Sequence, residues 1–310
     1  MALEEPDHTP SLPAYYGIPT FMRQPYSRTP IDADTIIVGI PFDSGSTSFR
    51  TGARFAPRAI REASLSLWGY NRYFNVDPSN ILNIIDYGDI NIDPVNIEST
   101  MYLIESETDN LLSSDPFSVG IGGDHSISLG LLRSYAKRHG PVGLIQFDAH
   151  SDTEQGRMDH GTPFRHAAEE GLIRENAWVQ IGSRGPLSHS REIEDACSLG
   201  ASVFDMDSCL EFGAERFFSL FSENFGTSPV YITFDMDVVD PAYAPGVGTP
   251  EVGGFTSREI VRLVRGLSSF NVIGMDLVEV TPTYDPSGIT SLLAATIIFE
   301  VLSGIASKKG

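Results

Sequence analysis

The 310-residue chain is predicted to form one three-layer α/β/α domain around a parallel sheet of about eight strands. Two observations predict this fold class. Short apolar runs recur along the sequence, and helical patterns separate most of them, as in parallel sheets covered on both faces. A chain of this length buries roughly three quarters of its extended surface, and no linker or internal repeat divides it. One domain is therefore expected.

Each predicted strand is a run of mostly apolar residues. Continuous runs of this kind are typical of strands that are buried on both faces of a sheet. The predicted strands are, in order, Thr35–Phe42, Ile81–Tyr87, Phe117–Ile121, Val142–Phe147, Trp178–Ile181, Ala201–Asp205, Val230–Phe234 and Val272–Val278.

Helix signals between the strands support this arrangement. Pro57 suits the first turn of a helix that continues through Ala63, and Thr256–Glu259 has the pattern of a capping box. The last predicted helix runs from about Thr290 to Leu302 and is strongly apolar. It is too short to span a bilayer, so we expect it in the core of the protein and not in a membrane.

Residues 1–33 precede the main domain and form a separate segment. Prolines at positions 6, 10, 13, 19, 25 and 30 argue against a regular helix or strand there. The stretch Tyr15–Met22 is nevertheless more apolar than a disordered tail usually is. We therefore predict an arm over residues 1–33 that contacts another subunit, followed by the main domain at residues 34–310.

Six carboxylate and imidazole side chains follow three of the predicted strands. Side chains alternate along an extended segment, so residues i, i+2 and i+4 project to the same side. The carboxyl ends of parallel strands meet at one edge of the sheet, where α/β proteins bind their ligands. The six side chains, which we predict to bind metal, are His125, Asp148, His150, Asp152, Asp235 and Asp237.

Four carboxylates and two imidazoles in one pocket require counter-charge. Like charges a few Å apart in a low dielectric repel one another by several kcal/mol, and divalent cations remove this conflict. An excess of carboxylates with one imidazole per ion favours Mn²⁺ over tetrahedral zinc, while Ni²⁺, Co²⁺ and Fe²⁺ stay open. Two such ions lower the pKa of a shared water and make it a nucleophile. The pattern therefore predicts metal-assisted hydrolysis.

These blocks, in this order, resemble the ureohydrolase family, which includes arginases and agmatinases. The resemblance extends over nearly the whole chain and is strongest to the agmatinase, guanidinobutyrase and proclavaminate amidinohydrolase branch. It implies an arginase-like fold and a trimer or hexamer, with Asp148 and Asp235 bridging the two ions. The matching segments are Gly45–Pro57, Gly122–Ser126, Asp148–Asp152, Phe234–Pro241, Gly248–Gly254 and Asp276–Pro282.

The resemblance also implies further roles around the two ions. His125 and Asp152 would complete the ligands of one ion, and His150 and Asp237 those of the other. Glu279 matches the glutamate that binds the guanidinium, a planar group whose paired N–H donors suit a carboxylate. Asp152 would also take a proton from the shared water and pass it to the leaving amine.

His160 matches a histidine that exchanges protons with solvent beside the substrate. Each assignment has a competing interpretation: an ordinary loop residue for His160, and a structural ion pair at the sheet edge for Glu279.

The segment that follows Asp152 bears on the substrate tail. Only seven residues, Thr153–Asp159, separate Asp152 from His160, fewer than is usual in related enzymes. This short loop predicts a wider entrance to the active site. Arg157 is a candidate clamp for a substrate carboxylate, and its competing interpretation is an exposed loop arginine. The favoured reaction converts 4-guanidinobutanoate, or a similar guanidino acid, to urea and an amine. Agmatine, 3-guanidinopropanoate, guanidine, N-substituted guanidines and biguanides such as metformin stay open as substrates.

Two functions of other classes fit part of the pattern: a non-catalytic partner subunit, and a histone-deacetylase-like amidohydrolase with one zinc. The complete ligand set favours the two-metal enzyme over both. The net charge of -20 argues against nucleic acid binding and suits a cationic substrate. The polar segment Met1–Pro10 lacks a signal-peptide pattern, so we expect a cytoplasmic protein without membrane attachment. We expect a homo-oligomer, and a hetero-oligomer with a paralogue stays open.

Overall fold

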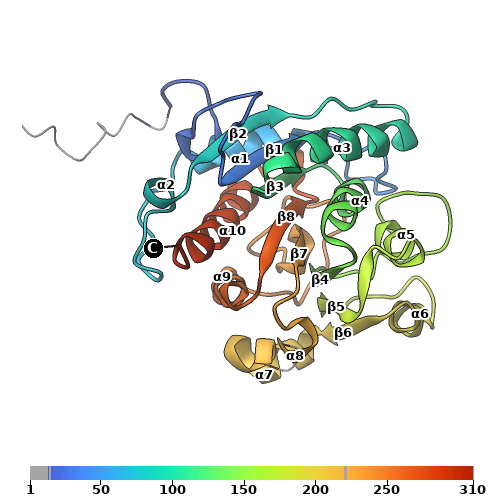
Figure 1. The fold of residues 1–310 in the computed structure, drawn as a ribbon. Helices are drawn as coiled ribbons and strands as arrows, with labels where there is room; N and C mark the ends of the chain where they lie inside the picture. The colour runs from blue at the N-terminus through green and yellow to red at the C-terminus, as the bar shows by residue number, and fades with distance from the viewer. Residues whose placement is uncertain (1–12, 14, 220–221, 310) are drawn as a thin grey trace, which may run out of the picture.

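An eight-stranded sheet in which every pair of neighbours is parallel forms the centre of the molecule (Figure 1). The computed structural model describes residues 13, 15–219 and 222–309. The order of the strands across the sheet is β2-β1-β3-β8-β7-β4-β5-β6. Their bounds are β1 Thr35–Ile40, β2 Ile84–Asp89, β3 Phe117–Gly122, β4 Val142–Phe147, β5 Ile173–Ser183, β6 Ala201–Asp205, β7 Val230–Asp235 and β8 Val272–Val278.

All eight predicted strands are confirmed. Their last residues differ from the prediction by at most two positions, as in β1, which ends at Ile40 and not at Phe42, and two of their starts differ by more. Strand β2 begins three residues after the predicted Ile81, because Pro78–Ile81 forms a one-turn helix, α2, whose first turn is capped by the side chain of Asp77. Strand β5 begins at Ile173, before the predicted Trp178. The extra residues of β5 include Asn176 with a positive φ of 58° and are partly exposed, so they lack the apolar run that marks a buried strand.

Helices cover both faces of the sheet and make the three predicted layers. One layer contains α1 Ala56–Ser64, α7 Met206–Ser219, α9 Ser257–Gly266 and α10 Ile289–Ala306. The other contains α3 Ile97–Leu111, α4 Ile127–His139 and α5 Pro163–Glu169. The short helices α6 Glu192–Ser198 and α8 Ser222–Phe225 contact β6 and β5 respectively.

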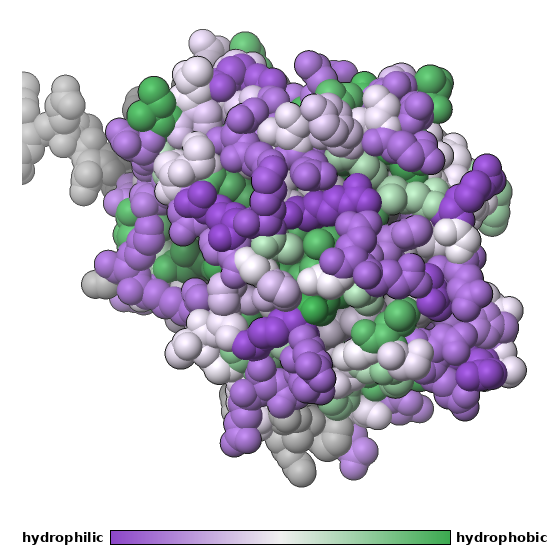
Figure 2. All heavy atoms as spheres, turned by 45° about the vertical axis from the view of Figure 1, so that its right-hand side comes forward, coloured by the Kyte–Doolittle hydropathy of each residue, from purple (hydrophilic) through white to green (hydrophobic). Residues whose placement is uncertain are grey.

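The side chains of each strand alternate between the two helical layers. In β1, Ile37 packs into the core on the side of α9 and α10, whereas Ile36 and Val38 pack into the core on the side of α3 and α4. The outer surface is polar by comparison: Figure 2, with the side of α4, α5 and α6 brought forward, shows mostly hydrophilic residues and small hydrophobic patches.

The predicted helix signals are present, and one length prediction is wrong. Thr256 and Glu259 form the capping box at the start of α9, and Pro57 lies in the first turn of α1. Helix α10 does not stop at Leu302 but continues to Ala306, because Gly304 packs closely against Ser268 and does not end the helix.

With 18 residues, α10 is the one helix of the described chain that is long and apolar enough to cross a membrane. The expectation that it would be too short was therefore wrong. Its burial gives a better criterion, since 78% of it is buried inside the protein and it packs against α1 and α9. Helix α10 is a core helix of this domain.

The end of the predicted arm packs on the chain's own domain. Phe21 is fully buried, and its backbone N–H donates to Oδ2 of Asp86 at 2.7 Å. Tyr15 and Ile18 are instead 90% and 88% exposed. Residues 1–12 and 14 of the predicted arm lie outside the described residues, and its contact with another subunit stays a prediction.

Candidate metal centre

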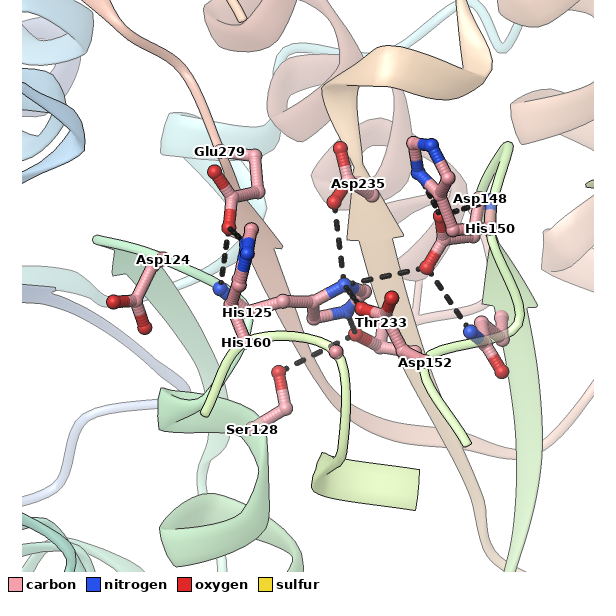
Figure 3. A network of polar contacts seen from close by, with 12 residues as sticks. Asp124, His125, Ser128, Asp148, His150, Asp152, His160, Thr233, Asp235 and Glu279 are labelled. Carbon is pink, nitrogen blue, oxygen red and sulfur yellow. Dashed lines mark hydrogen bonds and ion pairs between the residues drawn. The ribbon is translucent and has the colours of Figure 1, made fainter. Parts of the chain in front are cut away.

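The candidate site lies where four neighbouring strands of the sheet, β3, β8, β7 and β4, end side by side. Because these strands are parallel, the residues that follow them meet at one edge. This edge carries the predicted His125 after β3, Glu279 after β8, the Asp235 pair at the end of β7, and the Asp148 triplet after β4. Figure 3 shows the side chains of His125, Glu279, Asp235 and the Asp148 triplet converging from these separate segments.

The six predicted ligands form two groups that could each hold a metal ion. The first group consists of His125, Asp148, Asp152 and Asp235. The second consists of Asp148, His150 and Asp237, and in each group the candidate ligand atoms lie within 4.8 Å of one another. Asp148 belongs to both groups, as a bridging ligand should, whereas Asp235 belongs to the first alone.

The imidazole of His125 provides a test of whether a cation fits. Its Nδ1 is fully buried and has no hydrogen-bond partner. The same atom lies 2.8 Å from a carboxylate oxygen of Asp152 and 3.2 Å from one of Asp235. A buried nitrogen that faces carboxylates without forming a hydrogen bond suits a metal ligand, so the donors present fit a divalent ion.

The buried charges of both groups also favour a metal site. His150 Nδ1 lies 2.9 Å from Oδ2 of Asp237. Burial, followed by the charges of Asp152 and Asp237, raises the pKa of Asp148 to about 7. Burial and the charges of Asp237 and Asp148 likewise raise the pKa of Asp235 well above its ordinary value. Without metal, these carboxyls favour protons in the folded protein, and divalent cations would replace those protons.

A chain of hydrogen bonds fixes the orientation of His125. Its Nε2 lies 2.8 Å from the hydroxyl of Thr233, which donates to Asp276 at 2.7 Å. The hydroxyl of Tyr231 donates to the other oxygen of Asp276 at 2.9 Å. Because Thr233 uses its hydrogen toward Asp276, it accepts from Nε2–H and leaves the Nδ1 lone pair directed at the metal site.

A second chain supports Asp148 from inside the sheet. Gln146, which is fully buried, donates to Oδ2 of Asp148 at 3.0 Å and accepts from Nε1 of Trp178 at 3.1 Å. Gln146, Thr233 and Asp276 are not among the site residues predicted from the sequence. A signal was present for the first two, since each is a polar residue in an apolar run, two positions before a predicted ligand.

Glu279 and His160 also meet at this edge. Oε1 of Glu279 accepts from the backbone N–H of His125 at 2.9 Å and lies 3.1 Å from Nδ1 of His160. The other ring nitrogen of His160 lies 3.0 Å from the hydroxyl of Thr47. Burial disfavours the imidazolium, but the hydrogen bond and charge of Glu279 outweigh it and raise the pKa of His160 to about 9.

Two of these residues have an unusual backbone conformation. Asp152 and Glu279 have positive φ values of 49° and 63°, in the left-handed region, which Asp tolerates and Glu seldom adopts. Such a conformation costs about 1 kcal/mol or more and persists where the surrounding structure imposes it. In Glu279 the backbone is held by its N–H, which donates to the carbonyl of Gly123 at 2.9 Å.

A cavity of about 290 Å³ opens onto the two groups, and its lining includes His150, Asp152 and His160. Arg157, the predicted carboxylate clamp, is exposed and is not among the described residues that line this cavity. Its backbone carbonyl accepts from the hydroxyl of Thr162 at 3.3 Å. The structure thus brings every predicted site residue to the cavity or its inner edge except Arg157.

Comparison with known proteins agrees with the geometry of the site. Residues 33–304 match the model of the arginase family. The chain is 42% identical over 294 residues to proclavaminate amidinohydrolase of Streptomyces clavuligerus, with 94% of each chain covered. The solved structure of that protein superposes with a TM-score of 0.91, covering 96% of this chain and 99% of the other at 41% identity.

Two further relatives of similar identity are a guanidinobutyrase and an agmatinase. Guanidinobutyrase of Pseudomonas aeruginosa is 39% identical, covering 97% of this chain and 96% of the relative. Agmatinase of Citrobacter koseri is 42% identical, with 94% of each chain covered. The chain therefore belongs to the arginase family and is a ureohydrolase that acts on a guanidino compound.

Proposed function

We propose that the protein hydrolyses a small guanidino compound to urea and an amine at two divalent metal ions held by His125, Asp148, His150, Asp152, Asp235 and Asp237. The observation that supports this most directly is the pair of ligand groups that share Asp148 and lie beside Glu279. Mn²⁺ is the proposed ion because hard carboxylate oxygens predominate, with Ni²⁺ and Co²⁺ as alternatives. A single-zinc amidohydrolase fits less well, since it would use only one of the two groups.

The residues of the chain divide the reaction among them. When bound, the two ions would supply an activated water and neutralise the carboxylates around it. Glu279 would accept N–H bonds from the guanidinium and hold its carbon in line with that water. An oxygen of Asp152 would receive the water proton and deliver it to the leaving nitrogen.

His160 is suited to exchange this proton with solvent. Its ring bridges Glu279 and the hydroxyl of Thr47, and its side chain is 13% exposed in the wall of the cavity. An imidazole in this position can pass protons between the buried carboxylates and bulk water.

The identity of the substrate tail is the finer part of the proposal. The sequence favours 4-guanidinobutanoate or a similar guanidino acid, and the named relatives differ in the compounds that their names state. Agmatine, 3-guanidinopropanoate, guanidine, N-substituted guanidines and biguanides are the alternatives. The proposed enzyme is a cytoplasmic homo-oligomer, and analytical ultracentrifugation tests the oligomer directly.

Urea release tests the proposal. Protein loaded with Mn²⁺, Ni²⁺ or Co²⁺ is incubated with these compounds and with arginine, and metal content per subunit is measured in parallel. The expected result is urea from at least one compound at two ions per subunit. Absence of urea from every compound, with two ions bound, would instead support the non-catalytic partner subunit; saturation at one ion would contradict the two-metal site.

A further inference from the structure

We propose that the cavity selects guanidino compounds whose tails are cationic or neutral and rejects tails that carry a carboxylate, through the acidic side chains of Glu154 and Asp159. This inference rests on the proposed function and names its substrate class. It reverses the preference for a guanidino acid that the sequence suggests. The features that carry this inference are the short loop that follows Asp152 and the charged side chains on the cavity wall.

The loop Thr153–Asp159 is held at both ends by Gly161, the residue after His160. The backbone N–H of Glu154 donates to the carbonyl of Gly161 at 2.9 Å, and Oδ1 of Asp159 accepts from the N–H of Gly161 at 2.9 Å. Nε of Arg165 also donates to the carbonyl of Thr153 at 2.8 Å. These contacts fix the loop, and none of them uses the side chain of Glu154, which lines the cavity.

The two acidic side chains lie close together beside the metal-facing wall. Oδ1 of Asp159 and Oε2 of Glu154 lie 3.5 and 3.6 Å from the point that a Cβ would occupy at Gly161. Both residues line the same cavity as His160 and Asp152. A tail that extends outward from a guanidinium held at the metals thus passes two carboxylates.

A third carboxylate adds to the negative charge of the wall. Glu192 lines the cavity and is only 8% exposed. It accepts from the hydroxyl of Ser151 at 3.1 Å and from the backbone N–H of Ser188 at 2.7 Å. These bonds hold its charge in place but do not neutralise it, because both donors are uncharged.

No Arg or Lys lines this cavity among the described residues. Within that part of the chain, neither Glu154 nor Asp159 forms an ion pair. The nearby Arg184 donates to the carbonyls of Asp237 and Glu251, and Arg157 is exposed outside the lining. The cationic groups of the lining are the imidazoles of His150 and His160, which face Asp237 and Glu279 respectively. A substrate carboxylate would therefore meet the carboxylates of Glu154, Asp159 and Glu192, whereas an ammonium would be attracted to them.

The cavity is identified as a ligand site independently of its acidic wall. His125 Nδ1 is buried, lacks a hydrogen-bond partner, and lies beside Asp152 and Asp235, which both line the cavity. These donors are suited to hold a cation, and Glu154, Asp159 and Glu192 line the same cavity. These acidic side chains can therefore discriminate between substrates by the charge on their tails.

Three compounds with the same guanidino head and tails of similar length test the inference: agmatine with an ammonium, N-butylguanidine with no charge, and 4-guanidinobutanoate with a carboxylate. In the metal-loaded enzyme, kcat/KM should fall in that order, with about a tenfold or greater difference between the first and the last. Added salt should reduce the difference, because it screens charges near the entrance. A higher kcat/KM for 4-guanidinobutanoate than for N-butylguanidine would overturn the inference.

Charge-neutral variants test whether Glu154 and Asp159 cause this preference for cationic tails. In the double variant Glu154→Gln/Asp159→Asn, the agmatine to 4-guanidinobutanoate ratio of kcat/KM should fall about tenfold, and this ratio cancels any change in kcat/KM that both compounds share. The asparagine introduced by the second substitution retains an oxygen for the Gly161 N–H. Glu175→Gln removes an exposed carboxylate outside the cavity lining and should leave the ratio unchanged. An unchanged ratio in the double variant would refute the assignment.

Binding measurements distinguish failure of this inference from failure of the proposed hydrolytic function. If the metal-loaded protein releases no urea from any compound, the hydrolytic function fails. Calorimetry with the same three compounds then still measures the tail preference. Tighter binding of agmatine than of 4-guanidinobutanoate, lost in the double variant, would support the charge selection; equal binding would overturn it.

Discussion

Two clusters of buried charge lie in this domain, and they are balanced in different ways. At the edge of the sheet, Arg61 is 7% exposed and contacts Asp86 through two of its nitrogens, Nε at 2.9 Å and Nη2 at 3.0 Å. Its third nitrogen donates to Asp89 at 2.6 Å. At the centre of the sheet, the metal-ligand groups contain four carboxylates and two imidazoles, and the guanidinium of Arg184 donates to the backbone carbonyl of Asp237 at 2.6 Å.

The way in which the carboxylates are neutralised indicates the role of each cluster. The bidentate contact of Arg61 satisfies Asp86, which also accepts from the backbone N–H of Phe21, so this cluster ties the N-terminal segment to the sheet. In the central cluster, the pKa of Asp148 is raised to about 7 by burial and by its neighbours Asp152 and Asp237. A buried cluster whose carboxylate has a bidentate arginine partner is structural, whereas one whose carboxyls keep raised pKa values in the folded protein is suited to bind external cations.

Removal of a predicted bridging ligand should have the largest effect on urea release. Asp148→Asn, and separately Asp235→Asn, should lower urea release by about 10⁴-fold or more, because a bridging carboxylate supplies charge to both ions. Metal content per subunit, measured by mass spectrometry of the dialysed protein, should fall below two. Asp115→Asn, an exposed carboxylate that pairs with Arg138, serves as the control. Normal turnover in either variant would contradict the assigned roles.

Glu279→Gln sharpens the comparison, because Glu279 is a buried carboxylate at the same edge that belongs to neither metal group. Loss of its charge should reduce kcat/KM about 10³-fold while two ions stay bound, since the guanidinium loses its partner. Parallel assays of urea and metal content check this. Loss of metal from this variant would make Glu279 part of the metal site and not a substrate group.

Arg61→Met should break the structural cluster without affecting the metals. It leaves Asp86 buried without a cation, which should cost about 3 kcal/mol of unfolding free energy, measured by urea denaturation. The matched control is Arg133→Met, which breaks the more exposed contact with Glu170 and should cost less than about 1 kcal/mol. Equal losses in the two variants, or loss of bound metal in the first, would contradict the distinction between the clusters.

Metal removal should give a smaller, pH-dependent effect. Burial raises the pKa of Asp148 and Asp124 to about 7 in the metal-free protein, from an ordinary value of 3.8. Such carboxyls stabilise the folded state most at low pH, and this contribution is lost as the pH rises to about 7. The pKa of His160, raised to about 9, acts in the same direction above its ordinary value of 6.5. The Tm of the metal-free protein should therefore fall by several degrees between about pH 5 and pH 8.

The Mn²⁺-loaded protein provides the reference for this measurement. Bound ions stabilise the folded state and keep Asp148 charged, so its Tm should change less over the same range. Asp237, whose pKa is lowered to about 2 by the charge and hydrogen bond of His150 despite burial, titrates below this range. A Tm that rises with pH in the metal-free protein would contradict the assigned direction.

The sequence could predict the strands and the ligands for one physical reason. Alternation along a strand and the alignment of parallel strand ends decide where Asp148, His150 and Asp152 point, and both properties are local or follow from the fold class. The bond from His125 through Thr233 to Asp276 could not be predicted in this way. It connects β3, β7 and β8, and their adjacency depends on the strand order.

Loop side chains and helix ends set the other limits. Spacing placed Arg157 in the loop beside the substrate but could not decide which way its side chain points, and the structure exposes it. The acidic residues Glu154 and Asp159 lie in the same loop and do line the cavity. Helix α10 extends to Ala306 because tertiary packing around Gly304 outweighs the weak helix propensity of glycine.

The position of β8 in the sheet sets the order of events during synthesis of the protein. This strand, Val272–Val278, is the last to be made, yet it alone joins the β2-β1-β3 half of the sheet to the β7-β4-β5-β6 half. Until it leaves the ribosome, the edges of β3 and β7 are open, and His125 is not held against Asp148 and Asp235. Metal binding by the first ligand group would therefore require the closed sheet, because His125 comes from one half and Asp148 and Asp235 from the other.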